Sequence, residues 1–175
     1  MASKDTESPH ARLAKMVVES YVGQGKVFDV SDAPLELEGS RAGAFVCIKK
    51  DGELRGCIGT IEPAAGNIAE EIRNNSISAA MRDPRFPPVA PDELTKLTYS
   101  VDVLGEPEDV PDISCLDPKV YGVIVSASGG RSGLLLPDLE GVETAEEQVR
   151  IAMMKAGIRP GEHVDLRRFI VSRYD

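Results

Sequence analysis

Residues 44–59 read AFVCIKKDGELRGCIG. Two runs rich in apolar and β-branched side chains flank the dipeptide Asp51-Gly52 in this segment. An Asp-Gly pair between two such runs is typical of a two-residue β-hairpin turn, because both turn positions need a positive φ. We therefore predict an antiparallel hairpin, with one strand over residues 44–50 and the return strand over residues 53–59.

Helices and further strands are expected on both sides of this hairpin. Three helices are predicted, and their capping residues are Ser8, Asn67 and Thr144. Further strands are predicted over residues 94–104, 120–127, 131–136 and 164–173. The proline-rich stretch 83–88 is expected to be an ordered loop anchored by Phe86. Hairpins mixed with about three helices predict an α+β fold with a mainly antiparallel sheet, rather than a parallel doubly wound sheet.

Length and charge limit the classes of function. The 175 residues predict one domain over residues 1–175. The 20 basic and 29 acidic residues give a net charge of −9, and such a surface repels both nucleic-acid phosphates and anionic lipids. No apolar run approaches the roughly 18 residues of a membrane span, and the first ten residues lack an apolar signal segment. We therefore expect a cytoplasmic protein that binds neither nucleic acid nor membrane.

Cysteine and histidine usage argues against structural staples. The chain has three cysteines, at positions 47, 57 and 115, and no CxxC pair. An odd number without paired spacing makes a disulfide scaffold improbable. The two histidines, His10 and His163, lie far apart in the sequence, which leaves few ligands for zinc. Neither a metal site nor a cofactor is expected.

The segment with the clearest chemical character is the return strand of the hairpin. Arg55 places a cation two residues from Cys57, and a nearby cation lowers a thiol pKa and favours the nucleophilic thiolate. Cys57 is therefore the candidate catalytic residue, although no histidine base is near it in sequence. The alternative is that Cys57 is a small buried apolar residue. Gly56, Gly59 and Thr60 would allow a ligand to approach the backbone.

The hairpin register decides which side chains share a face of the sheet. If Asp51-Gly52 is the turn and the pairing is regular, Val46 lies opposite Cys57, and Arg55 shares the face of Cys57. Cys47 then points to the other face, and the two cysteines cannot form a disulfide. A slip of one residue would reverse this conclusion.

Three arginines are candidates for an anion-binding cluster. Arg55 is in the return strand, Arg85 is in the proline-rich loop, and Arg131 follows the glycines of the second hairpin. A guanidinium group binds carboxylate or phosphate through two parallel hydrogen bonds. The alternative is that the three arginines are unrelated and pair with local carboxylates.

The heptapeptide LRGCIGT at residues 54–60 resembles the signature of the AMME syndrome chromosomal region family (the AMMECR domain). Prokaryotic members are called AmmeMemoRadiSam system protein A. The similarity continues in other blocks, at residues 78–88, 121–125, 130–137 and 155–157. Ser132 departs from the pattern, because many relatives carry a second basic residue there.

The resemblance implies an α+β fold of two packed subdomains, without a settled reaction. It also implies partners, because relatives are often encoded with, or fused to, a Memo-like protein and a radical-SAM protein. Two interpretations follow. In the first, the protein is an enzyme or enzyme subunit in which Cys57 acts on a small anionic or protein-borne substrate. In the second, it is a non-catalytic module that binds a partner protein through the same face.

Overall fold

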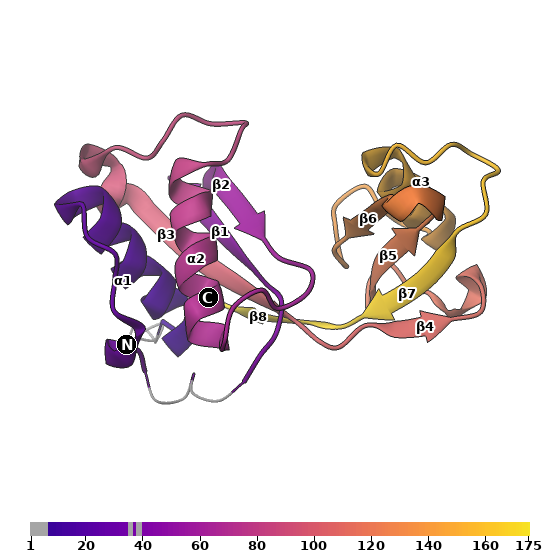
Figure 1. Ribbon diagram of the computed structural model, residues 1–175. Helices are drawn as coiled ribbons and strands as arrows, with labels where there is room; N and C mark the ends of the chain where they lie inside the picture. Colours follow the sequence, from indigo (N-terminus) through magenta and orange to yellow (C-terminus); the bar gives the residue numbers. More distant parts are fainter. Residues whose placement is uncertain (1–6, 35–36, 38–39) are drawn as a thin grey trace, which may run out of the picture. The chain divides into compact units, whose positions relative to one another are not determined.

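The structure is a computed structural model of the chain, and it describes residues 7–34, 37 and 40–175. The chain divides into two compact units (Figure 1). The first comprises Met1–Val103 and Ser172–Asp175, and the second comprises Leu104–Val171. Each unit contains one four-stranded sheet with its own hydrophobic core. The predicted α+β class with mainly antiparallel sheets is confirmed.

The first unit is built on a sheet with strand order β2-β1-β3-β8. The strands are β1 (Ala44–Lys50), β2 (Glu53–Gly59), β3 (Leu97–Leu104) and β8 (Val171–Tyr174). The helix α2 (Ile68–Met81) packs on β1 and β2, and α1 (Pro9–Gln24) packs on α2 (Figure 1). Val46 and Ile48 of β1 are fully buried in this core together with Leu13 and Ile72 of the helices.

Local signals set the ends of these elements, as the sequence predicts. Asp51 and Gly52 both have a positive φ, of 50° and 87°, which is the geometry that the Asp-Gly turn predicts. The Ser8 hydroxyl accepts the Ala11 N–H at 3.1 Å, at the start of α1. The Asn67 side chain accepts the Glu70 N–H at 2.9 Å, at the start of α2. The hairpin and these two helix starts are confirmed.

The second unit has strand order β4-β7-β5-β6. The strands are β4 (Glu108–Val110), β5 (Gly122–Ser126), β6 (Ser132–Leu135) and β7 (Asp165–Phe169). The helix α3 (Ala145–Lys155) packs on β5 and β6 (Figure 1). Val149 and Ala152 of α3 pack with Val123 and Val125 of β5 in this core.

Three predicted boundaries are wrong. The single last strand over residues 164–173 is two strands in different sheets, β7 and β8, which are separated at Ile170. The start predicted at residue 94 is a 3₁₀-helix, η3 (Pro91–Lys96), because Pro91 fixes φ and Glu93 accepts the Ala90 N–H. Residues 106–118, where the sequence predicts no strand, contain the short strand β4, which pairs with β7. The errors at the last strand and at β4 have the same cause, because the strands with which these segments pair lie far away in the sequence.

Candidate functional site

The β1–β2 hairpin contains a bulge that changes which residues face each other. Lys49 pairs with Leu54 and Ile48 pairs with Gly56, so Arg55 has no opposite residue. An extra residue in one strand shifts the pairing beyond it by one position. Cys47 therefore lies directly opposite Cys57, and Val46 lies opposite Ile58. The predicted register, with Val46 opposite Cys57 and the cysteines on opposite faces, is wrong.

The bulge has a physical cause in the contacts of Arg55. The Arg55 guanidinium binds both carboxylate oxygens of Glu93 at 3.0 Å and donates to the backbone oxygens of Pro87 and Pro88. These bonds hold Arg55 beside η3 and the proline-rich loop, and Gly56 takes the position opposite Ile48. Arg55 also holds the pKa of the Glu93 carboxyl well below its usual range, with help from Lys50. The charge predicted to activate Cys57 is thus paired with Glu93.

The two glycines of the motif are required by the packing of the protein itself. A Cβ at Gly56 would lie 2.2 Å from the Ala79 carbonyl oxygen of α2. A Cβ at Gly59 would lie 2.3 Å from the Phe45 ring, which is on the opposite strand. The close approach predicted at these positions is therefore made by α2 and by Phe45.

Thr60 ends the motif in a buried polar network. Its hydroxyl donates to Glu71 and accepts from the Asn75 amide at 3.2 Å. Glu71 is 2% exposed, and its second oxygen accepts the backbone N–H groups of Ala64 and Ala65 at 2.9 and 2.8 Å. The Thr60 side chain therefore connects the end of β2 to α2.

Asp83 anchors the proline-rich loop to the hairpin. Its side chain is 2% exposed, and Oδ2 accepts the Cys57 N–H at 2.9 Å and the Arg85 guanidinium at 2.7 Å. Arg85 also donates to the Cys57 carbonyl oxygen at 3.3 Å. The loop is ordered as predicted, but Asp83 is its buried anchor, whereas Phe86 is only half-buried.

Arg85 and Arg55 both contact the hairpin within the first unit, through Cys57 and the bulge respectively. Arg131 belongs to the second unit, where its guanidinium binds Glu162 at 2.6 Å and the Gly157 carbonyl oxygen at 3.2 Å. This pairing lowers the pKa of Glu162 to about 2. Each of the three arginines predicted to bind anions has a carboxylate partner in the protein.

The two cysteines lie directly opposite each other on one face of the sheet. The neighbouring Cys57 thiol, with help from the Lys49 and Arg173 cations, lowers the pKa of Cys47 to about 7. The adjacent Cys47 thiol, together with burial, raises the pKa of Cys57. Cys47 is therefore the thiol that ionises first, and Cys57 stabilises its thiolate. Both cysteines are half-buried and free.

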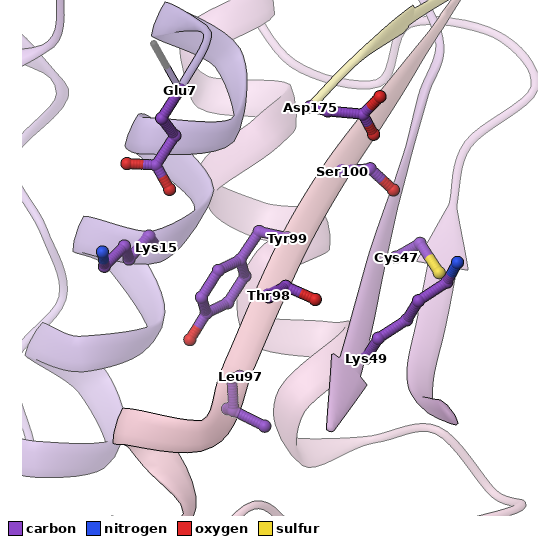
Figure 2. A pocket seen from close by; sticks show the side chains of 9 residues that line it. All are labelled: Glu7, Lys15, Cys47, Lys49, Leu97, Thr98, Tyr99, Ser100 and Asp175. Atoms are coloured by element: carbon purple, nitrogen blue, oxygen red, sulfur yellow. The ribbon is translucent and has the colours of Figure 1, made fainter. Parts of the chain in front are cut away.

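A pocket with a cavity volume of about 540 Å³ adjoins Cys47. Its lining residues are Glu7, Lys15, Cys47, Lys49, Leu97, Thr98, Tyr99, Ser100 and Asp175. Figure 2 shows Cys47 and Lys49 of β1 beside Thr98 and Ser100 of β3. β3 forms one wall of the pocket, and β1 lies between β3 and β2. Cys57, on β2, is therefore one strand farther from this wall than Cys47, on β1. The three predicted arginines are not among the described residues that line it.

Tyr99 forms the other wall of this pocket. Figure 2 shows its ring on the other side of β3 from Cys47 and Lys49, which is the side on which Lys15 of α1 lies. Tyr99 is 7% exposed, and its hydroxyl has no hydrogen-bond partner among the residues that the structure describes. Burial raises the pKa of this phenol, so it is a neutral donor at pH 7. A buried donor without a partner is costly.

Sequence reasoning did not identify Cys47, Lys49 or Tyr99 as site residues. These residues match no motif, and only the bulge brings Cys47 opposite Cys57. The glycine at position 56 is an available signal, because a glycine within a strand often marks a bulge. The described part of the chain contains no cluster of three metal-ligating side chains. Within residues 7–34, 37 and 40–175, no helix has the length and hydropathy that crossing a bilayer requires.

Comparison with known sequences identifies the family. The sequence profile of AMMECR1 matches residues 11–175. The chain belongs to the AMMECR1 family. A Thermotoga maritima AMMECR1 relative is 56% identical over 171 residues, which cover 96% of this chain and 98% of that protein. A Clostridium acetobutylicum relative is 46% identical over 175 residues, and there the chain spans 37% of the relative's length.

A solved structure supports the same assignment for the AMMECR1 fold. The crystal structure of an uncharacterized protein from Pyrococcus horikoshii superimposes with a TM-score of 0.84 and 31% sequence identity. The superposition covers 94% of this chain and 88% of that one. The family membership predicted from LRGCIGT and its neighbouring blocks is confirmed, as is the α+β class.

Proposed function

We propose that this AMMECR1-family protein is an enzyme or enzyme subunit that uses a cysteine thiol on a small anionic or protein-borne substrate. The observation that carries this proposal is the opposition of Cys57 and Cys47 beside a pocket. Cys47 attacks the substrate as the thiolate, and Cys57 of the RGCIG strand donates the hydrogen bond that keeps it ionised. In this proposal Cys57 takes part as the hydrogen-bond donor, and Cys47 is the residue that contacts the substrate first.

Cations around the pocket support an anionic group on the substrate. Lys15 and Lys49 both line the pocket. Lys49 lies two residues from Cys47 on the same strand, so the two side chains share a face. An ammonium group there stabilises the thiolate first and a substrate carboxylate after binding.

The remaining motif residues position this pair. Gly56 lets α2 approach the hairpin, Thr60 connects β2 to α2, and Arg55 and Arg85 connect the hairpin to η3 and to the proline-rich loop. We place the chemistry in the cytoplasm, where thiols are kept reduced.

The test is the pH dependence of alkylation at each cysteine of the native protein, read by mass spectrometry. We expect Cys47 to react fastest, with a midpoint near pH 7, because the thiolate is the reacting form. Cys115, in the other unit, is the internal control, with an ordinary midpoint expected near about 8.5. If Cys47 reacts no faster than Cys115 at pH 7, the proposed thiol chemistry is wrong.

One observation favours the alternative of a non-catalytic module that binds proteins. The arginines and glycines of the motif already have partners within the protein, as in a rigid scaffold. Memo-like and radical-SAM proteins are the partners that the family resemblance supplies for this test. Two results together would favour this module. The first is that either purified protein binds the wild type but neither Arg55→Ala nor Phe86→Ala. The second is that alkylation of Cys47 in the wild type is slow.

A further inference from the structure

We propose that Cys47 and Cys57 form a reversible cross-strand disulfide, and that the pair reduces a small zwitterionic disulfide bound in the adjacent pocket. This activity rests on the proposed thiol function and specifies its substrate class. The three observations that carry it are the register of the hairpin, the position of Cys47 at the pocket, and the charges and polar groups that line the pocket.

The register brings the two sulfur atoms within bonding reach. Residues directly opposite each other in an antiparallel pair have Cα atoms about 4.5 to 5.5 Å apart, and disulfides form when this distance is about 4.4–6.8 Å. Cys47 and Cys57 are such a pair. Residues directly opposite each other present their side chains on the same face of the sheet, so the two thiols lie side by side. Closure of the disulfide therefore requires little movement of the backbone.

The pocket makes the roles of the two thiols different. Cys47 lines it, whereas Cys57 lies one strand farther from β3. An incoming disulfide therefore meets Cys47 first, and Cys57 is positioned to attack Cys47 afterwards. The pKa of Cys47, about 7, also suits this role, since the most effective attacking thiol has a pKa near the ambient pH.

The exchange has two balanced steps. In the first, the Cys47 thiolate attacks one sulfur of the substrate disulfide; a Cys47–substrate disulfide forms, and one substrate thiolate leaves. This leaving thiolate takes the proton of the Cys57 thiol. In the second, Cys57 sulfur attacks Cys47 sulfur, the intramolecular disulfide forms, and the second substrate thiolate leaves to be protonated by solvent. Two electrons pass from the cysteine pair to the substrate.

The lining of the pocket selects the substrate class. On the Cys47 side of β3, the pocket is lined by the Lys49 ammonium and the Asp175 carboxylate, whereas Lys15 and Glu7 line it on the α1 side (Figure 2). This combination complements a molecule that carries carboxylates and ammonium groups together, such as an amino-acid disulfide. A volume of about 540 Å³ fits a small molecule in the usual size range of ligand pockets.

The experiment is equilibration of the full chain with cystine, followed by peptide mass spectrometry. In the wild type we expect a Cys47–Cys57 disulfide that a dithiol reductant reverses. In Cys57→Ser, a mixed disulfide with cystine should accumulate on Cys47. In Cys47→Ser, we expect the mixed disulfide on Cys57 to form about tenfold more slowly than the mixed disulfide on Cys47 forms in Cys57→Ser. The reason is that an ordinary thiol is only a few per cent ionised at pH 7. Cys115→Ser is the matched control and should behave as the wild type.

A neutral disulfide, 2-hydroxyethyl disulfide, tests the selection by charge. We expect Lys49→Met, on the Cys47 side of β3, to slow the reaction with cystine more than the reaction with the neutral disulfide. Rapid alkylation of Cys47 without a Cys47–Cys57 disulfide would overturn the exchange and leave the thiol function standing. Slow alkylation of Cys47 would overturn both. Equal slowing of both reactions in Lys49→Met would overturn the zwitterionic substrate.

Discussion

Asp83 Oδ2 accepts the backbone N–H of Cys57 at 2.9 Å, across 26 positions of sequence. The same carboxylate binds the Arg85 guanidinium, so one buried charge joins the outer edge of the hairpin to the proline-rich loop. Cys57 therefore has a fixed backbone on one side and a thiol partner, Cys47, on the neighbouring strand. This arrangement makes Cys57 a rigid support for Cys47.

Asp83 should make stability depend on acid pH. Its pKa is held well below the usual range, chiefly by the Arg85 hydrogen bond. A depressed folded pKa gives stability that is present above the unfolded value of about 3.9 and is lost as pH falls toward the folded value. We expect Asp83→Asn to cost about 1–3 kcal/mol at pH 7 and progressively less between about pH 5 and pH 2. Urea unfolding across this range measures the difference, which a constant cost would contradict.

Removal of the Cys57 thiol should make Cys47 less acidic. The hydrogen bond from Cys57 is the largest cause of the low pKa of Cys47. In Cys57→Ala the alkylation midpoint of Cys47 should move from about 7 toward about 8.5, and Lys49→Met should give a smaller shift in the same direction. Cys115→Ser serves as the control. An unchanged midpoint in Cys57→Ala would exclude Cys57 as the donor.

Arg55 should matter for stability and not for thiol reactivity. Its side chain is 12% exposed and paired with Glu93, and it is not among the causes of the pKa shift of either cysteine. We expect Arg55→Met to lower the free energy of unfolding by about 1–3 kcal/mol without moving the alkylation midpoint of Cys47. Unfolding and alkylation are measured on the same preparation. A raised midpoint would restore the direct role for Arg55 that the sequence predicts.

Gly56 should tolerate no side chain, because a Cβ there would meet the Ala79 carbonyl oxygen at 2.2 Å. We expect Gly56→Ala to destabilise the protein by about 1–3 kcal/mol through overpacking. The matched control is Gly52→Asn, at a turn position where a Cβ would have no neighbour within 4 Å and where asparagine accepts the positive φ. Chemical unfolding compares the two variants, and equal costs would argue against close packing of α2 on the hairpin.

The Tyr99 hydroxyl should contribute little to stability or to activity. Its hydroxyl is buried without a partner among the described residues, so Tyr99→Phe should leave stability unchanged or raise it by about 1 kcal/mol. The hydroxyl oxygen is buried and is not reached from the pocket, so the same variant should reduce cystine at the wild-type rate. Thermal unfolding and the exchange assay measure the two effects. A Tyr99→Phe variant that is clearly less stable would indicate a structural role for the hydroxyl.

Local chemistry determined most of the elements. The positive φ values of Asp51 and Gly52 and the helix caps at Ser8 and Asn67 depend on neighbouring residues alone, so the sequence predicts them well. The family likewise follows from the sequence without any structure, because the AMMECR1 profile matches residues 11–175. The split of the last strand at Ile170 could not be predicted this way, because it depends on which sheet each half joins.

The face of Cys47 was decided only by tertiary contacts. Arg55 is drawn toward Glu93, which lies 38 positions away, and Gly56 packs against Ala79 of α2. Together these contacts favour the bulge. The bulge shifts the pairing of β2 with β1 by one residue, so Cys57 lies opposite Cys47 and not opposite Val46. The amino-acid sequence thus specified a hairpin with two cysteines, and long-range contacts placed the two thiols together.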